Sequence, residues 1–187
     1  MDMAYFPRST TIKLAITSTL VAMALATNYA LIWLPNVKLM DSIVFFTAYA
    51  FGFIYGAIAA VTIWLIYGIF NPYGFNLLTL IMVITGEFFY VLFALLLRKF
   101  VNPVELIKRN GNLTLIAFFA LISTLLYDIY TNALVGLIWY NSIWLGLLTM
   151  NFPYPFGIMH QISNTVLMPI IVSAGVYILY LRGVIHG

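Results

Sequence analysis

Residues 42–70, SIVFFTAYAFGFIYGAIAAVTIWLIYGIF, form a stretch of 29 residues without a charged side chain. A helix that crosses a bilayer needs about 20 apolar residues, so this stretch either crosses a membrane once or turns back inside it. At 1.5 Å per residue it reaches about 43 Å, which is less than two crossings of a core about 30 Å thick. A hairpin here would therefore have short or tilted helices, and the two glycines of FGFIYG, residues 51–56, would supply its turn.

The composition of the whole chain is that of an integral membrane protein. Of its 187 residues, 64% are hydrophobic and 7% are charged, whereas soluble domains are about one quarter charged. The chain has no cysteine, which excludes disulfides, thiolate catalysis and thiolate metal sites. The cations lie at the ends of apolar segments and form no basic face, so we expect no nucleic-acid partner. We predict one all-α transmembrane domain, residues 1–187, embedded in the lipid bilayer.

The positions of Lys and Arg favour the hairpin over a single crossing. Cytoplasmic loops collect these residues, and a single crossing of 42–70 would place the cations near residues 98–109 outside. With the hairpin, seven of the eight Lys and Arg residues lie inside and Lys38 alone lies outside. We therefore expect six helices, a short second and third among them, in the cell membrane with both termini cytoplasmic. Their expected ranges are 12–34, 41–52, 56–70, 75–99, 113–140 and 158–182, with an outer turn at 71–74 and a long external loop at 141–157.

Two acidic residues, Glu87 and Asp128, lie deep inside the apolar runs. Each is about 17 Å below the outer end of its expected helix, so they share a depth. A carboxylate in mid-membrane is costly unless it is protonated or paired, and such residues usually face a cavity or a partner. Because no Lys or Arg lies deep inside an expected span, we expect a proton, hydrogen-bond donors, a bound cation or a cationic ligand to fill this role.

Further polar and aromatic residues share helical faces with these acids, at i, i+3 and i+4 spacing. We expect them to line an outward-opening pocket for an aromatic, hydrogen-bonding solute, with no metal and no cofactor. The alternative is that the polar groups only bond neighbouring helices, and that His160 and Gln161 mark the water interface. The expected substrate-binding residues are Glu87, Tyr90, Asp128, Asn132, Trp139, His160, Gln161 and Asn164.

Three short motifs stand in an order that matches one transporter family: LPNVKL at 34–39, AFGFIYGA at 50–57 and NPYG at 71–74. The chain resembles the substrate-binding S component of energy-coupling factor (ECF) transporters, the vitamin-uptake relatives of ABC importers. The resemblance implies six helices, both ends inside, and partnership with a transmembrane coupling subunit and two ATPase subunits. It also implies that helix 12–34 docks on the coupling subunit through small residues at four-residue spacing, here Ser18, Ala22, Ala26 and Ala30.

Within that family, Glu87, Trp139 and Asn164 are similar in type and placement to residues of the thiamine-binding branch. Asp128 has no counterpart there. Thiamine is therefore the first solute to consider, while riboflavin, another vitamin, a queuosine precursor and an amino-acid-like solute remain open. The chain has no Walker-type glycine loop, so ATPase partners would have to supply the energy.

Two other classes of function fit the same residues. Glu87, Asp128 and His160 could serve as acid-base or metal groups of a small intramembrane enzyme acting on a lipid or isoprenoid. Against this, metal-ligand spacing such as HExxH is missing, and His160 should lie nearer the outer surface than the two acids. The third class is a self-sufficient proton-coupled carrier, in which one of the two acids is protonated because the other is close.

Overall fold

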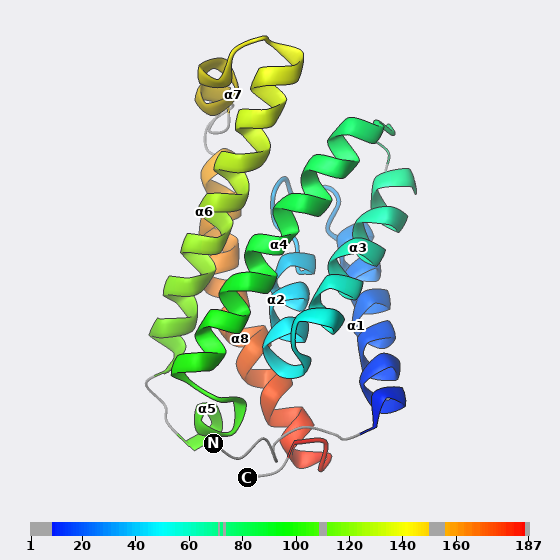
Figure 1. Ribbon diagram of the computed structural model, residues 1–187, viewed down its shortest axis with the longest axis vertical. Coiled ribbons are helices and arrows are strands. Elements are labelled where there is room, and N and C mark those ends of the chain that lie inside the picture. Colours follow the sequence, from blue (N-terminus) through cyan, green and yellow to red (C-terminus); the bar gives the residue numbers. More distant parts are fainter. Residues whose placement is uncertain (1–8, 71, 73, 109–111, 150–155, 186–187) are drawn as a thin grey trace.

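The computed structural model describes residues 9–70, 72, 74–108, 112–149 and 156–185, and these residues form eight α-helices and no strand (Figure 1). The helices are α1 (Thr10–Ala30), α2 (Met40–Phe51), α3 (Phe53–Phe70), α4 (Leu77–Phe100), α5 (Pro103–Lys108), α6 (Asn112–Trp139), α7 (Ile143–Thr149) and α8 (Phe156–Leu181). The predicted all-helical architecture is confirmed for this part of the chain.

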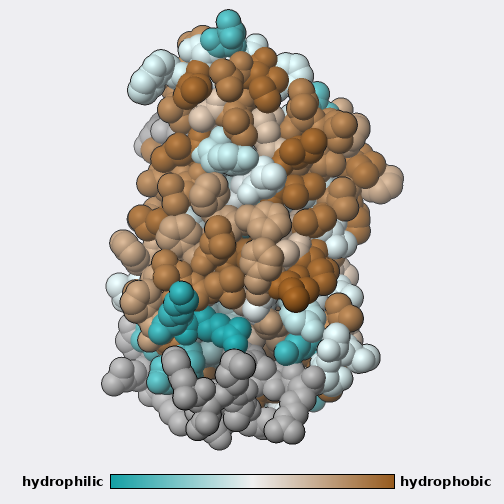
Figure 2. Space-filling model, in the orientation of Figure 1, coloured by the Kyte–Doolittle hydropathy of each residue, from teal (hydrophilic) through white to brown (hydrophobic). Residues whose placement is uncertain are grey.

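Five of the helices, α1, α3, α4, α6 and α8, are long and apolar enough to cross a membrane. Much of the face seen in Figure 2 is apolar, and hydrophilic side chains gather near one end of it. The sixth expected span corresponds to α2, whose 12 residues cover about 18 Å. That length is too short to cross a hydrocarbon core about 30 Å thick. The structure therefore supports a multi-pass membrane protein with five helices of spanning length.

The short helix α2 lies at the centre of the bundle. All twelve of its residues are buried, and it contacts α1, α3, α4 and α8. A helix without a polar face needs neighbours on every side, and its uncharged run of Ile, Val, Phe and Ala is suited to that position. We expected this segment to be one arm of a hairpin. It is instead the central helix of the bundle, and α1, α3, α4 and α8 pack on it.

The predicted turn at FGFIYG is present, but its two glycines have different roles. Gly52 ends α2 with a φ of 96°, a backbone conformation that side chains with a Cβ disfavour. Gly56 lies inside α3, which begins at Phe53 and not near residue 56 as expected. A Cβ on Gly56 would lie 2.5 Å from the Cβ of Ala48. This glycine therefore lets α2 and α3 pack closely.

Several helix ends differ from the expected ones. α1 ends at Ala30, four residues before the predicted end. α4 begins at Leu77, because the Asn76 side chain caps it by accepting a hydrogen bond of 3.0 Å from the backbone N–H of Thr79. Within the expected outer turn, residues 71 and 73 lie outside the described part of the chain. The first described turn of α1 and the last turn of α8 lie at the same end of the molecule (Figure 1).

The segments expected to be loops contain two short helices. α5 follows α4, and α7 lies within the predicted loop 141–157, of which residues 150–155 are not described. α7 packs on α6 at two glycines: a Cβ on Gly146 would lie 2.1 Å from the carbonyl oxygen of Asn132 and 2.6 Å from the Cα of Gly136. The sequence feature that accompanies α7 is therefore this pair of glycines, which lets α7 pack closely on α6; a hydrophobic periodicity did not predict the helix.

Candidate functional site

His160 of α8 joins two carboxylates inside the bundle. Its Nδ1 lies 2.7 Å from Asp128 Oδ1 on α6, and its Nε2 lies 2.8 Å from Asp41 Oδ2 in the first turn of α2. All three residues are buried. A neutral imidazole carries one N–H, so an arrangement with a carboxylate at each ring nitrogen requires an imidazolium or a protonated carboxyl group.

Amide side chains extend this network along α8. Asn164 donates from its amide nitrogen to Asp41 Oδ2 at 2.9 Å, and the same nitrogen lies 3.2 Å from the hydroxyls of Tyr90 and Thr124. Gln161 donates to Asp128 Oδ2. Four helices, α2, α4, α6 and α8, are therefore tied together by polar side chains at one level of the bundle.

Glu87 of α4 lies beside this network and is fully buried. The indole N–H of Trp64 donates to Glu87 Oε1 at 2.9 Å, and the Glu87 and Asp41 carboxyl groups interact. No donor among the described residues reaches Glu87 Oε2. Because an unsatisfied buried oxygen is costly, this atom calls for a proton or for a donor from a bound molecule.

Lys38, in the connection between α1 and α2, is a half-buried cation near the acids, where we expected none. Its Nζ lies 4.9 Å from the centre of the Tyr67 ring and 5.5 Å from that of Trp64. Burial lowers the pKa of Lys38, while the nearby Asp41 and Glu87 carboxylates oppose that change. The expectation that no protein cation accompanies the acids was wrong, because the chain before α2 folds back toward them.

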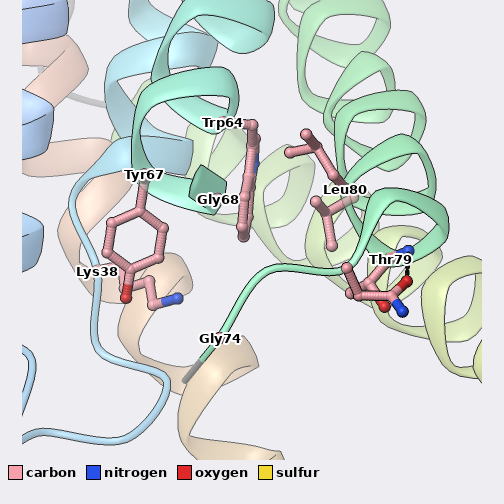
Figure 3. A pocket seen from close by; sticks show the side chains of 9 residues that line it. Lys38, Trp64, Tyr67, Gly68, Gly74, Thr79 and Leu80 are labelled. Carbon is pink, nitrogen blue, oxygen red and sulfur yellow. Dashed lines mark hydrogen bonds between the residues drawn. The ribbon is translucent and has the colours of Figure 1, made fainter. Parts of the chain in front are cut away.

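Three cavities meet at Lys38. The polar cavity, of about 300 Å³, is lined by Asn36, Lys38, Asp41, Trp64, Tyr127, Asp128, Thr131, Asn132, Thr149, Gly157 and His160. The α3–α4 cavity, of about 350 Å³, is shown in Figure 3, where Trp64 stands between Lys38 and Tyr67 on one side and Thr79 and Leu80 on the other. The third cavity, of about 440 Å³, lies along the connection that follows α1.

Most of the residues predicted for the site come together. Glu87, Tyr90, Asp128, His160, Gln161 and Asn164 belong to the buried polar group, and Asn132 lines the polar cavity while donating to the Asp128 backbone carbonyl at 2.8 Å. His160, which we expected nearer the outer surface than Glu87 and Asp128, is hydrogen-bonded to Asp128 and is buried. Trp139 is 53% exposed at the last residue of α6 and lines none of the three cavities.

Sequence reasoning missed Lys38, Asp41 and Trp64. Lys38 and Asp41 were expected on the outer side because they follow the first expected span, with Asp41 at the start of the expected helix 41–52. The available signal was the run itself: a helix without a polar face is buried from its first turn, and Asp41 stands in that turn. An acid there is favoured by the positive end of the helix dipole.

The small residues predicted for docking face away from the bundle. Ser18, Ala22, Ala26 and Ala30 are all exposed, whereas the buried face of α1 carries Thr17, Val21, Ala24 and Asn28. The packing of α1 within this chain therefore does not use the small-residue stripe.

Within the described residues, no group of three or more His, Asp or Glu side chains is placed to hold a metal ion. No protein-family model matches the chain, and no curated protein and no solved structure matches it significantly.

Proposed function

We propose that the chain is the membrane-embedded, solute-binding S component of an ECF-type importer, which takes up a small water-soluble vitamin or a related micronutrient. The observation that carries this proposal is the polar cavity at Asp41, Asp128 and His160. Its volume of about 300 Å³ lies at the lower end of the range for small-molecule sites. In the proposed role the chain performs no chemistry, and two ATPase subunits supply the energy.

The polar groups support a binding role because Asp41, Asp128 and His160 line a cavity. Polar residues that serve only to join helices would complete one another's hydrogen bonds, but here Glu87 Oε2 and Asn164 Oδ1 are buried without a partner among the described residues. Buried polar atoms are rarely left in that state. Glu87 bonds Trp64 and Asn164 bonds Asp41, and both of these partners line the polar cavity.

The proposed topology has six passes, with both termini in the cytoplasm of the cell. α2 leads the chain into the bundle, the turn at Gly52 reverses it and α3 leads it back, so that the pair acts as the expected hairpin. The start of α1 and the end of α8 lie at one end of the molecule (Figure 1), which supports an even number of passes. The excess of Lys and Arg assigned to that side supports its cytoplasmic orientation.

The exposed stripe on α1 supports docking on a transmembrane coupling subunit. Small residues allow two helices in a membrane to approach closely and gain van der Waals contact. Since Ala22 and its stripe partners are exposed, they are accessible to a helix of another chain.

The intramembrane-enzyme alternative is favoured by one observation, the histidine held between two aspartates. A general base, however, needs one ring nitrogen directed at the substrate. Both nitrogens of His160 already face carboxylates, which is an arrangement for holding a structure together. An intramembrane enzyme is therefore the second candidate function.

The test is to purify the protein in lipid nanodiscs, expose it to a water-soluble metabolite extract, and identify retained molecules by mass spectrometry. We expect a retained solute that raises the thermal midpoint, as any ligand selective for the folded state must. Ala22→Leu should leave this binding intact and impair assembly with a coupling module. The proposal fails if the purified protein retains no water-soluble molecule.

A further inference from the structure

Lys38 is the one charged residue that lines all three cavities, among the residues that the structure describes. It is also the only charged residue in the lining of the α3–α4 cavity and of the third cavity. A solute that extends from the polar cavity toward α3 and α4 would pass Lys38 and Trp64, the two residues that line both cavities.

The ammonium group is held by aromatic rings and not by an anion. Tyr67 and Trp64 present their faces to Nζ, at 4.9 and 5.5 Å from the ring centres. Within the described part of the chain both ion pairs belong to His160, and neither contains Lys38. An ammonium group has three N–H donors, which a ring face satisfies less well than an oxyanion does.

Each neighbouring carboxylate accepts a hydrogen bond from a group other than Lys38, and Glu87 does so through Oε1 alone. Asp128 accepts from His160 and Gln161, and Asp41 accepts from His160 and Asn164. Glu87 accepts from the Trp64 indole. The electrostatic attraction of these groups is felt at Lys38, but each has a closer partner, so the first coordination sphere of the ammonium is left for a bound molecule.

We propose that the solute carries an oxyanion, a carboxylate or a phosphate, which pairs with Lys38 where the polar cavity meets the α3–α4 cavity. The remainder of the solute lies against Trp64, which lines both cavities. This inference rests on the solute-binding function proposed above and names the class of its substrate. The proposal disfavours thiamine, because the Lys38 ammonium group lies over the Trp64 and Tyr67 rings and would repel the cationic thiazolium.

The experiment uses pairs of solutes that differ in the anionic group. Nanodisc-embedded protein is equilibrated with a metabolite extract supplemented with nicotinate and nicotinamide, pantothenate and pantothenol, riboflavin 5′-phosphate and riboflavin, and thiamine. Retained molecules are identified by mass spectrometry, and their affinities are measured by calorimetry. We expect the retained solute to be anionic and its neutral partner or amide analogue to bind about 10- to 100-fold more weakly, the range for a charged hydrogen bond.

Variants at Lys38 test the same contact. Lys38→Met should weaken binding of the anionic solute by about 10- to 100-fold, and Lys38→Arg should retain most of it. Lys13→Met is the matched control, since Lys13 also lies over an aromatic ring, 5.6 Å from the centre of Tyr55, but lines none of the three cavities. If Lys38→Met does not fold, the solute pairs measured on the natural sequence decide the question alone.

Retention of a neutral or cationic solute, or unchanged binding in Lys38→Met, would overturn the oxyanion proposal and leave the solute-binding function standing. Tighter binding of thiamine to Lys38→Met would show that Lys38 occupies the place of a cationic solute. Retention of no molecule at all would instead overturn the proposed function, and with it the basis of this inference.

Discussion

The two ends of α2 are equally buried but differently built. At its first turn, Asp41 belongs to a network of charged and amide side chains beside the polar cavity. Toward its last turn, Tyr49 donates to the Val101 carbonyl at 2.8 Å, and the Phe46 ring lies so close to Gly175 that an added Cβ would come within 2.5 Å of it. One end is close-packed, while the other keeps space and unsatisfied polar atoms. A buried helix can therefore be a rigid support at one end and a wall of a cavity at the other.

The largest expected effect comes from breaking the close-packed end. In Gly56→Leu the new Cβ would lie 2.5 Å from the Ala48 Cβ and 3.0 Å from its Cα, so α2 and α3 must separate. Overpacking costs about 1–3 kcal/mol and more where backbone is in the way. We expect loss of monodisperse protein, measured by size-exclusion chromatography and thermal unfolding in detergent. Ala15→Leu, on the exposed face of α1, is the control, and equal behaviour of the two variants would contradict the close-packing argument.

A smaller effect is expected at the polar end. Asp41→Ala and His160→Ala each remove one partner of a buried ion-paired network, which costs about 3 kcal/mol. The double variant should lose less than the sum, because residues in one network couple by about 1 kcal/mol or more. The free energy of unfolding in a detergent titration measures this cycle.

The control for that cycle pairs Asp41→Ala with Glu105→Ala on α5, an exposed residue. These two changes should add to within about 0.5 kcal/mol. Strict additivity of Asp41→Ala and His160→Ala would show that the contact between them contributes nothing to stability.

The smallest expected effect is a difference in solute affinity between two tryptophan substitutions, neither of which lies on α2. Trp64→Phe removes the indole N–H that bonds Glu87 and changes the wall shared by two cavities. We expect solute affinity to fall about tenfold, the value of one hydrogen bond to a charged or polar group. Trp139→Phe, at an exposed position, should change affinity by no more than about twofold. Calorimetry with the retained solute distinguishes them, and the opposite order would move the binding site to the end of α6.

Much of the fold was predictable because apolar length is a direct physical requirement of the bilayer. The long helices, the reversal at Gly52 and the burial of Glu87 and Asp128 all follow from uncharged runs and the residues that interrupt them. The unpredicted parts depend on contacts between distant segments. Asp41 is buried and Lys38 half-buried because the connection before α2 enters the bundle, and the connection itself resembles an outer loop in its sequence.

Trp139 shows the opposite error: it was predicted to lie in the site, and it is exposed. Helical spacing correctly places it on α6 beyond Asp128 and Asn132, but spacing cannot tell how far along a helix the neighbouring helices extend. The buried face of α6 ends near Gly136, where α7 packs. Periodicity therefore identifies the face of a helix, and tertiary packing decides which part of that face meets the site.

The shortness of α2 also has a consequence for how the chain is made. Twelve residues with a carboxylate at one end cannot reside stably in a bilayer alone, since the segment neither spans the core nor shields its charge. Its neighbours include α8, which is synthesised more than 100 residues later, as the printed numbering shows. The central helix thus enters the nascent chain early and acquires its last neighbour only when synthesis is nearly complete.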